Sequence, residues 1–173
     1  ACIAIQANQN EMHGGQSVPN FDYAMAEGVK KTYRKQYFRA LAQYIEVRFD
    51  MSASDAAALT AAIKEALGTD VTMHAAEAYA EKLRAFLPRH QAENGFQIIT
   101  GDAARAAAEY AAKTAYKETD NATYQAMEAL VHNLNTMNSR AGAQVPFSSL
   151  NYGTDTSPEG RMAVHNLLRA TEA

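Results

Sequence analysis

The sequence has very little cysteine, because Cys2 is the single thiol in 173 residues. One cysteine cannot form a disulfide within the chain, and such low usage suits a reducing compartment. We therefore expect a cytoplasmic protein. A cysteine in an apolar helix start is usually a small core residue, so we assign Cys2 no catalytic role.

Long apolar runs and strong charge are also missing. No stretch approaches the roughly 20 apolar residues of a membrane span, and no signal peptide is evident. The net charge of −3 is mild, so charge implies no nucleic-acid partner. These features predict neither a membrane nor a nucleic-acid partner. The apolar pattern has begun by Ile3 and is still present near Ala173, so we expect the chain to be a piece of a longer polypeptide.

Familiar catalytic and metal-binding patterns are absent as well. The histidines are far apart in the sequence and no cysteine accompanies them, which predicts no metal site. The chain contains no Gly-x-Ser-x-Gly elbow, phosphate loop or dinucleotide glycine pattern. We predict no catalytic residue within these 173 positions. The five histidines are His13, His74, His90, His132 and His165.

The richest stretch is a predicted strand near residues 144–151. Val145, Phe147 and Leu150 supply its apolar positions. Pro146 has no N–H, which places this end of the strand at an edge, a bulge or an entry point. No other strand is evident in the sequence, so the strand is expected to lack a partner within the chain.

A polar loop and a helix start follow that strand. Either Ser157 caps the helix with Pro158 at the first helical position, or Thr156 caps it and Glu159 closes a capping box. A strand, a polar loop and a helix N-terminus build sites in α/β proteins at the carboxyl ends of strands. An ordinary polar turn is the alternative interpretation.

The rest of the chain is predicted to be helical and to form one structural unit. Ser52 and Asp55 match a capping box for a helix that stops at Gly68. Pro88 is expected to end another helix, and Asp102 to cap an alanine-rich one. The expected helices cover residues 3–13, about 21–44, 52–67, 71–87, 103–117 and 120–137, with Gly14-Gly15 ending the first and a loop over 89–101.

Two features suggest binding. The long helix carries a basic face, which is either solvated or able to hold a phosphate. Arg140 offers a five-donor fork to phosphate or carboxylate, or else ties down helix C-terminal carbonyls. The basic face consists of Lys30, Lys31, Arg34, Lys35 and Arg39.

Three segments together resemble a known family. Gln-Asn-Glu-Met-His-Gly-Gly-Gln-Ser-Val-Pro-Asn-Phe-Asp-Tyr covers residues 9–23, and Ser-Arg-Ala-Gly-Ala-Gln-Val-Pro-Phe-Ser-Ser-Leu-Asn-Tyr-Gly-Thr-Asp-Thr-Ser-Pro-Glu-Gly-Arg covers 139–161. Residues 122–137 fit between them, and residues 50–110 contribute little. In this order the segments resemble the anaerobic (class III, glycyl-radical) ribonucleoside-triphosphate reductases.

The resemblance implies an α/β fold, a ten-stranded α/β barrel, in a homodimeric cytoplasmic oxidoreductase. Residues 1–173 would be a single partial domain from the early barrel with dimer-face helices, mostly helical with one strand near 144–151. The sequence has no ATP-cone, four-cysteine zinc ribbon or glycyl-radical loop. The cysteines of the radical chemistry would lie outside the chain, so the fragment alone is expected to be inactive.

The resemblance also implies the chemistry and the partners. The family converts ribonucleoside triphosphates to deoxyribonucleoside triphosphates by thiyl and glycyl radicals, with formate or a thiol as reductant. A radical-SAM activase, with S-adenosylmethionine and an iron–sulfur cluster, installs the glycyl radical. The full-length protein holds zinc, and ATP or deoxynucleotide effectors set substrate choice. The alternative is a non-catalytic helical module for dimerisation and effector binding, and a free-standing helical protein ranks after both.

Site residues follow from the resemblance, position by position. Lys35 and Phe147 match effector-binding positions. Where the family places an acidic partner for the effector, this sequence reads His132-Asn133, which leaves the effector's identity open. The residues expected to face the substrate are Arg140, Ser148, Ser149 and Asn151.

Overall fold

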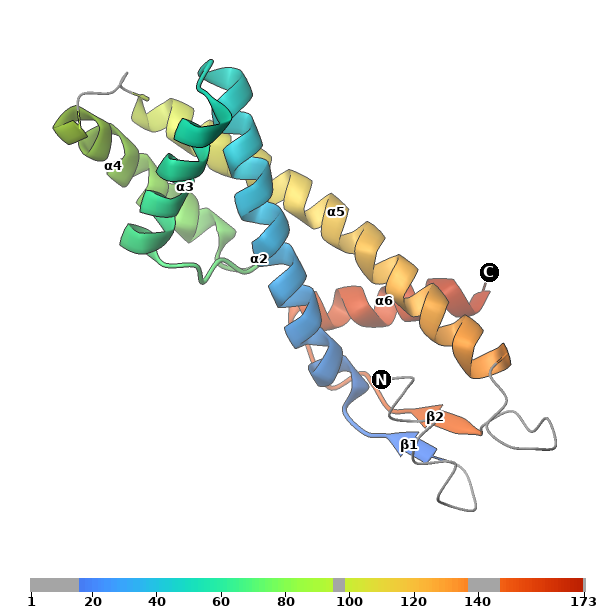
Figure 1. Ribbon diagram of the computed structural model, residues 1–173. Helices are drawn as coiled ribbons and strands as arrows, with labels where there is room; N and C mark the ends of the chain where they lie inside the picture. The colour runs from blue at the N-terminus through green and yellow to red at the C-terminus, as the bar shows by residue number, and fades with distance from the viewer. Residues whose placement is uncertain (1–15, 95–98, 137–146, 173) are drawn as a thin grey trace. The chain divides into compact units, whose positions relative to one another are not determined.

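The computed structural model of the chain describes residues 16–94, 99–136 and 147–172. These residues form five helices and two short strands (Figure 1). In order they are β1 (Gln16–Val18), α2 (Phe21–Arg48), α3 (Ala53–Leu67), α4 (Ala76–Asn94), α5 (Gly101–Thr136), β2 (Ser148–Leu150) and α6 (Pro158–Glu172). The predicted mostly helical character is confirmed. None of the described helices has the length and apolarity that crossing a bilayer requires.

The chain divides into two compact units. We call Ala1–Val29 with Asp120–Ala173 the strand unit, and Lys30–Thr119 the helical unit. Helices α2 and α5 each begin in one unit and end in the other. The prediction of a single partial domain stays a prediction, and each unit is described by itself below.

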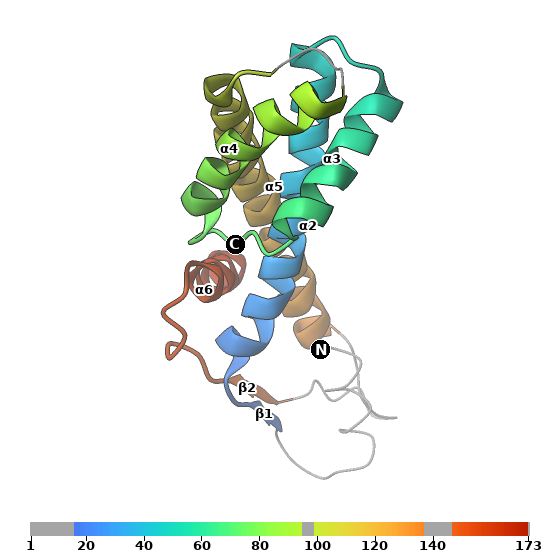
Figure 2. The same ribbon diagram turned by 90° about the vertical axis from the view of Figure 1, so that its left-hand side faces the viewer.

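The two strands of the strand unit pair in parallel. Gln16 lies opposite Ser148 and Val18 opposite Leu150, and Figures 1 and 2 both show β1 beside β2. The predicted strand near 144–151 is confirmed over 148–150, whereas the expectation that it lacks a partner within the chain is wrong. A three-residue strand is too short to show an alternating pattern, which is why β1 escaped the sequence analysis.

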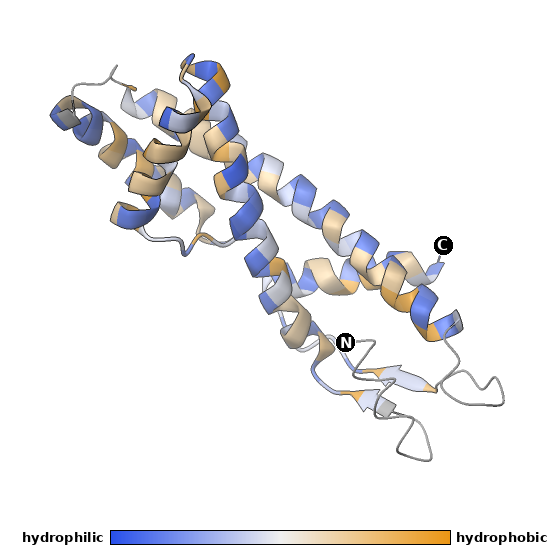
Figure 3. Cartoon of the chain, in the orientation of Figure 1, coloured by the Kyte–Doolittle hydropathy of each residue, from blue (hydrophilic) through white to orange (hydrophobic). Residues whose placement is uncertain are grey.

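The helical unit has an apolar core built from one face of each of its helices. Blue and orange alternate along α2 and α5 in Figure 3, as expected for helices with one buried side. Tyr37 packs edge-on against Phe38 and Tyr79, with ring centroids 5.5 and 5.7 Å away. Burial raises the pKa of Tyr79 to about 12, and its hydroxyl donates to the Gly68 carbonyl at 2.8 Å. This core is self-contained within residues 30–119.

Several predicted helix boundaries are wrong. The helix expected over 71–87 begins only at Ala76. Pro88 lies inside α4, and the predicted loop is helical as far as Asn94. Leu83, Leu87 and Gln91 continue one buried face across the proline, and this burial outweighs the lost backbone hydrogen bond. Likewise, the predicted helices 103–117 and 120–137 form one continuous α5.

Local capping signals had mixed success. The Ser52 cap is confirmed, because its hydroxyl accepts the Asp55 N–H at 3.1 Å. The Asp55 carboxylate accepts the Ser52 hydroxyl at 2.7 Å, and not the backbone N–H that completes a capping box. Gly68 ends α3 with a φ of 78°. The assignment of Asp102 as a cap is wrong, because the Thr100 hydroxyl accepts the Ala103 N–H at 3.3 Å. The predicted helix 3–13 and its Gly14-Gly15 end lie outside the described residues.

Candidate functional site

The carboxyl ends of β1 and β2 meet at one edge of the parallel pair, as they must in a parallel arrangement. The chain leaves β1 through Pro19 and Asn20 into α2, and leaves β2 into the polar loop. Asn151 connects the segments that follow the two strands. Its N–H donates to the Val18 carbonyl at 3.1 Å, and its carbonyl accepts the Phe21 N–H at 2.9 Å. The edge predicted to carry a site is therefore a continuous hydrogen-bonded structure.

Asp22, in the first turn of α2, holds the loop after β2. Its Oδ2 atom accepts the backbone N–H groups of Gly153, Thr154 and Asp155 at 2.8, 2.9 and 2.8 Å. Its Oδ1 atom accepts the N–H of Tyr23 at 3.0 Å. The side chain is fully enclosed. Four backbone donors thus satisfy one buried carboxylate.

These donors favour the charged form of the carboxylate. The Asp155 N–H has the largest effect and lowers the pKa of Asp22 from its ordinary 3.8, while burial opposes it and the N–H groups of Gly153, Tyr23 and Thr154 assist. Because the pKa of Asp22 is lower in the folded than in the unfolded state, the carboxylate stabilises the fold at pH values above its unfolded-state pKa. That stabilisation is lost as the pH falls through its folded-state pKa. The carboxylate is ionised throughout the neutral range.

The loop then turns into α6 through a compact cap. Ser157 is the cap, since its hydroxyl accepts the Gly160 N–H at 3.1 Å and Pro158 opens the helix. This confirms the first of the two predicted caps and excludes the Thr156 alternative. The Asp155 carboxylate accepts the Ser157 N–H at 2.8 Å. A Cβ on Gly160 would lie 2.5 Å from the Asp155 carboxyl, so only glycine fits there.

The residues of β2 and its end that were predicted to face the substrate differ in exposure and lie on different faces of the strand. Ser149 and Asn151 are exposed, whereas Ser148 is half-buried. Successive side chains on a strand point to opposite faces, so Ser148 and Ser149 cannot address the same side. Ser148 and Leu150 line a pocket of about 450 Å³ together with Val131, Leu134, Asn135, Tyr152, Leu167, Leu168 and Thr171. The Ser148 hydroxyl is enclosed there, and none of the described residues forms a hydrogen bond with it.

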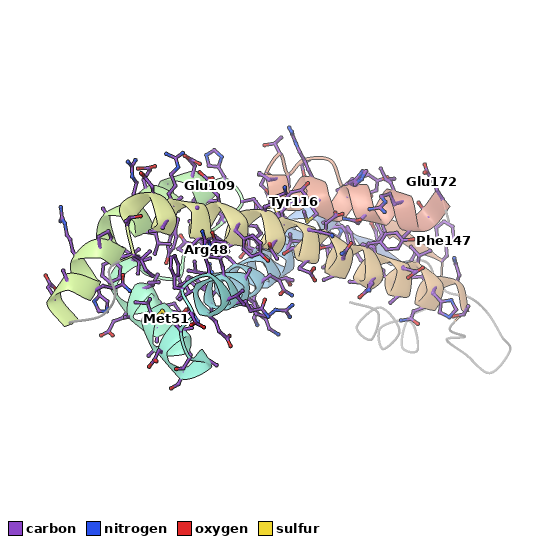
Figure 4. The ribbon with its side chains drawn as sticks, turned by 90° about the horizontal axis from the view of Figure 1, so that it is seen from above. Arg48, Met51, Glu109, Tyr116, Phe147 and Glu172 are labelled. Carbon is purple, nitrogen blue, oxygen red and sulfur yellow. The ribbon has the colours of Figure 1, made fainter. Side chains whose placement is uncertain are left out.

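The predicted effector residues fall in different units. Lys35 is exposed on the part of α2 that belongs to the helical unit. Phe147, labelled in Figure 4, precedes β2 in the strand unit and is 79% exposed. Within the basic face, Arg34 is paired with Asp70 at 3.1 Å. Arg140 lies outside the described residues, and its role stays a prediction.

Sequence reasoning missed Asp22. Its position in the first turn of a helix is an ordinary place for an acidic residue, and nothing nearby signals more. Its partners in the loop begin at Gly153, 131 positions later. Spacing along the chain could not have paired them.

The described residues do not fit a metal centre. In residues 16–94, 99–136 and 147–172, no three His, Cys, Asp or Glu side chains gather as ligands. We therefore assign zinc binding to none of these side chains, and a zinc site elsewhere in the reductase stays a prediction.

The comparisons address family membership. A search among curated proteins gives no match. The family model described as anaerobic ribonucleoside-triphosphate reductase matches residues 1–173. The match includes both the helical unit and the parallel strand pair with its polar loop. The chain belongs to the anaerobic ribonucleoside-triphosphate reductase family.

Proposed function

We propose that this chain is an early segment of the catalytic barrel of an anaerobic ribonucleotide reductase, and that it binds nucleotides rather than performing the radical steps. In this proposal β1 and β2 are two neighbouring strands of a ten-stranded α/β barrel. The edge at Asn151 faces the ribonucleoside triphosphate. The family match over 1–173 supports the reaction class.

The parallel pairing of β1 and β2 is the observation that carries the barrel proposal. Within the described residues each strand has one neighbour, which leaves its other edge unpaired. Two short strands are marginal alone, and parallel sheets occur in proteins that cover both faces. The outward Ser149 and the exposed Phe147 lie on this small sheet or next to it. More strands of the same reductase would cover them.

At the substrate edge the chain supplies positioning groups. Ser149 and Asn151 are exposed where β2 ends, so their hydroxyl and amide groups are free to donate to sugar or phosphate oxygens. We assign Arg140 to the same substrate, as a bidentate donor to phosphate. Ser148 addresses the opposite face and its pocket. We keep Ser148 as a substrate-facing candidate, on the pocket side of the strand.

Lys35 and Phe147 are the residues that we propose contact an effector nucleotide, each considered within its own unit. Among the described side chains, none forms an ion pair with Lys35 that would compete with a triphosphate. An ammonium meets phosphate as a point charge, and an exposed phenyl ring provides a surface on which a base can stack. The effector is ATP or a deoxynucleotide.

Other parts of the reductase supply the radical chemistry. A glycyl radical, which a radical-SAM activase with S-adenosylmethionine and an iron–sulfur cluster would install, would supply the thiyl-radical chemistry of ribose reduction from outside these residues. Formate or a thiol is the reductant, zinc is structural, and the enzyme works as a cytoplasmic homodimer. The role proposed for this chain's own residues is to bind and orient the nucleotides.

A second candidate function rests on the self-contained core of the helical unit. A helical module for dimerisation and effector binding needs no chemistry of its own. Nucleotide binding by this chain without turnover would favour it.

The reading frame around this sequence gives the first test. The proposal expects a thiyl-radical cysteine loop and a Cys-Gly-Tyr glycyl site downstream of residue 173. The activated, complete polypeptide should then reduce a ribonucleoside triphosphate under anaerobic conditions, with product measured by chromatography. A frame that ends shortly after Ala173, or an activated protein that makes no deoxynucleotide, would refute the enzyme assignment.

Lys35→Ala tests the effector site. Loss of one charged contact to phosphate should weaken effector binding by about tenfold to a hundredfold, since such contacts contribute roughly 1.5–3 kcal/mol. Isothermal titration with ATP and deoxynucleotides measures the change. Lys82→Ala, at another exposed lysine of the helical unit, is the matched control and should bind as the wild type does. Equal affinities in the two variants would remove Lys35 from the site.

A further inference from the structure

We propose that Asp22 is a positioning residue for the substrate edge: its carboxylate occupies an anion nest formed by the loop after β2 and thereby fixes where Asn151 and Ser149 stand. The inference rests on the proposed function of that edge. It adds a residue that neither the sequence analysis nor the family resemblance assigned.

The first step is the shape of the loop. Three successive backbone N–H groups, from Gly153 to Asp155, converge on one carboxylate oxygen at 2.8–2.9 Å. Consecutive converging amides form a concavity that binds anions. Gly153 has a φ of +107°, a conformation that L side chains rarely adopt. The chain therefore contains an anion site and fills it with its own carboxylate.

The second step connects the nest to the edge. Asp22 follows Phe21, whose N–H donates to the Asn151 carbonyl at 2.9 Å. Gly153 lies two residues beyond Asn151. The residue expected to contact substrate is therefore held on one side by its own backbone bonds to Val18 and Phe21, and on the other by the nest.

A further contact supports a fixed loop. The Tyr23 hydroxyl lies 3.3 Å from the Thr154 carbonyl and donates to it. Residues at the start of α2 thus bind both the N–H groups and a carbonyl of the same loop. The loop has few alternative conformations while Asp22 is ionised. Site residues held this way act within a narrow geometry, where small displacements are costly.

Two substitutions at Asp22 distinguish the effect of its charge on the position of the loop from the effect of simply filling the nest. Asp22→Asn keeps the shape but removes the charge and one of the two acceptor oxygens, so an NH2 group faces an N–H donor while the nest remains occupied. Asp22→Ala empties the nest and leaves room for a small carboxylate. Acetate is the probe, because formate is a potential reductant. Asp102→Asn, at an exposed carboxylate paired with Arg84 at 3.3 Å, is the control.

The experiment uses the complete activated reductase, with steady-state kinetics for a ribonucleoside triphosphate and amide hydrogen exchange over residues 151–157. Both Asp22 variants should raise KM by about tenfold to a hundredfold, with a smaller change in kcat and faster exchange of the loop. Acetate, but not chloride at equal ionic strength, should restore the KM and the exchange protection of Asp22→Ala. Asp22→Asn should not be rescued.

Each other outcome counts against the proposal. Faster exchange with an unchanged KM would make Asp22 merely structural and would leave the proposed function standing. Unchanged exchange, or rescue by chloride as well as acetate, would refute the nest. An inactive wild-type reductase would refute the proposed function itself, and this inference with it. If Asp22→Ala does not fold, Asp22→Asn with the Asp102→Asn control still decides through KM and exchange.

Discussion

The two units of the chain are stabilised in different ways. The helical unit buries tyrosine, leucine and alanine in one apolar cluster. Its ion pairs lie at the surface, where Arg105 contacts Glu77, Glu81 and Glu109. The strand unit buries two carboxylates, Asp22 and Glu159. Burying charged groups is costly unless they are hydrogen-bonded. The comparison indicates that one unit is built for stability and the other to hold a polar loop in place.

The helical core should give the largest effect. Leu41 is completely buried, and Leu41→Ala should lower the free energy of unfolding by about 2–5 kcal/mol through lost burial and a cavity. Val47, on the same helix, is 83% exposed, so Val47→Ala should stay within about 0.5 kcal/mol of wild type. Urea denaturation measures both. A small loss at Leu41 would contradict the assignment of the main core to this unit.

Glycines in the strand unit should respond with opposite signs. A Cβ at Gly160 would lie 2.5 Å from the Asp155 carboxyl, whereas a Cβ at Gly28 meets nothing within 4 Å. Gly160→Ala should destabilise by about 1–3 kcal/mol through overpacking. Gly28→Ala should stabilise by about 0.5–1 kcal/mol, because alanine favours the helix. Thermal unfolding of the two variants gives the signs directly, and a shared sign would show that the loop yields easily.

Matched helix caps provide the finest comparison. Ser52 and Ser157 each accept a backbone N–H at 3.1 Å, one in each unit. Ser52→Ala and Ser157→Ala should each cost about 1 kcal/mol of stability. Only Ser157→Ala should also raise the KM of the complete reductase, because its cap adjoins the loop held by Asp22. Equal KM values in the two variants would break the proposed division of roles.

The sequence predicted what depends on neighbours along the chain. Ser52 with Asp55, and Ser157 with Pro158, are short-range signals. The Ser52 cap was predicted directly, whereas Ser157 was one of two alternatives that only the structure separated. Pro88 misled because buried Leu83, Leu87 and Gln91 keep α4 helical through tertiary packing. β1 was missed because three residues are too few to show an alternating pattern. Asp22 was missed because its partners in the loop lie more than a hundred positions away. Short-range signals therefore located the loop, and only the fold identified the carboxylate that holds it.

The positive φ of Gly153 has a consequence for natural variation. A residue with a side chain there would be strained, and a loop that relaxed the strain would turn its amides away from Asp22. Across related sequences the two positions should then change together or not at all. An alignment in which each drifts independently of the other would mean that evolution does not treat them as a pair.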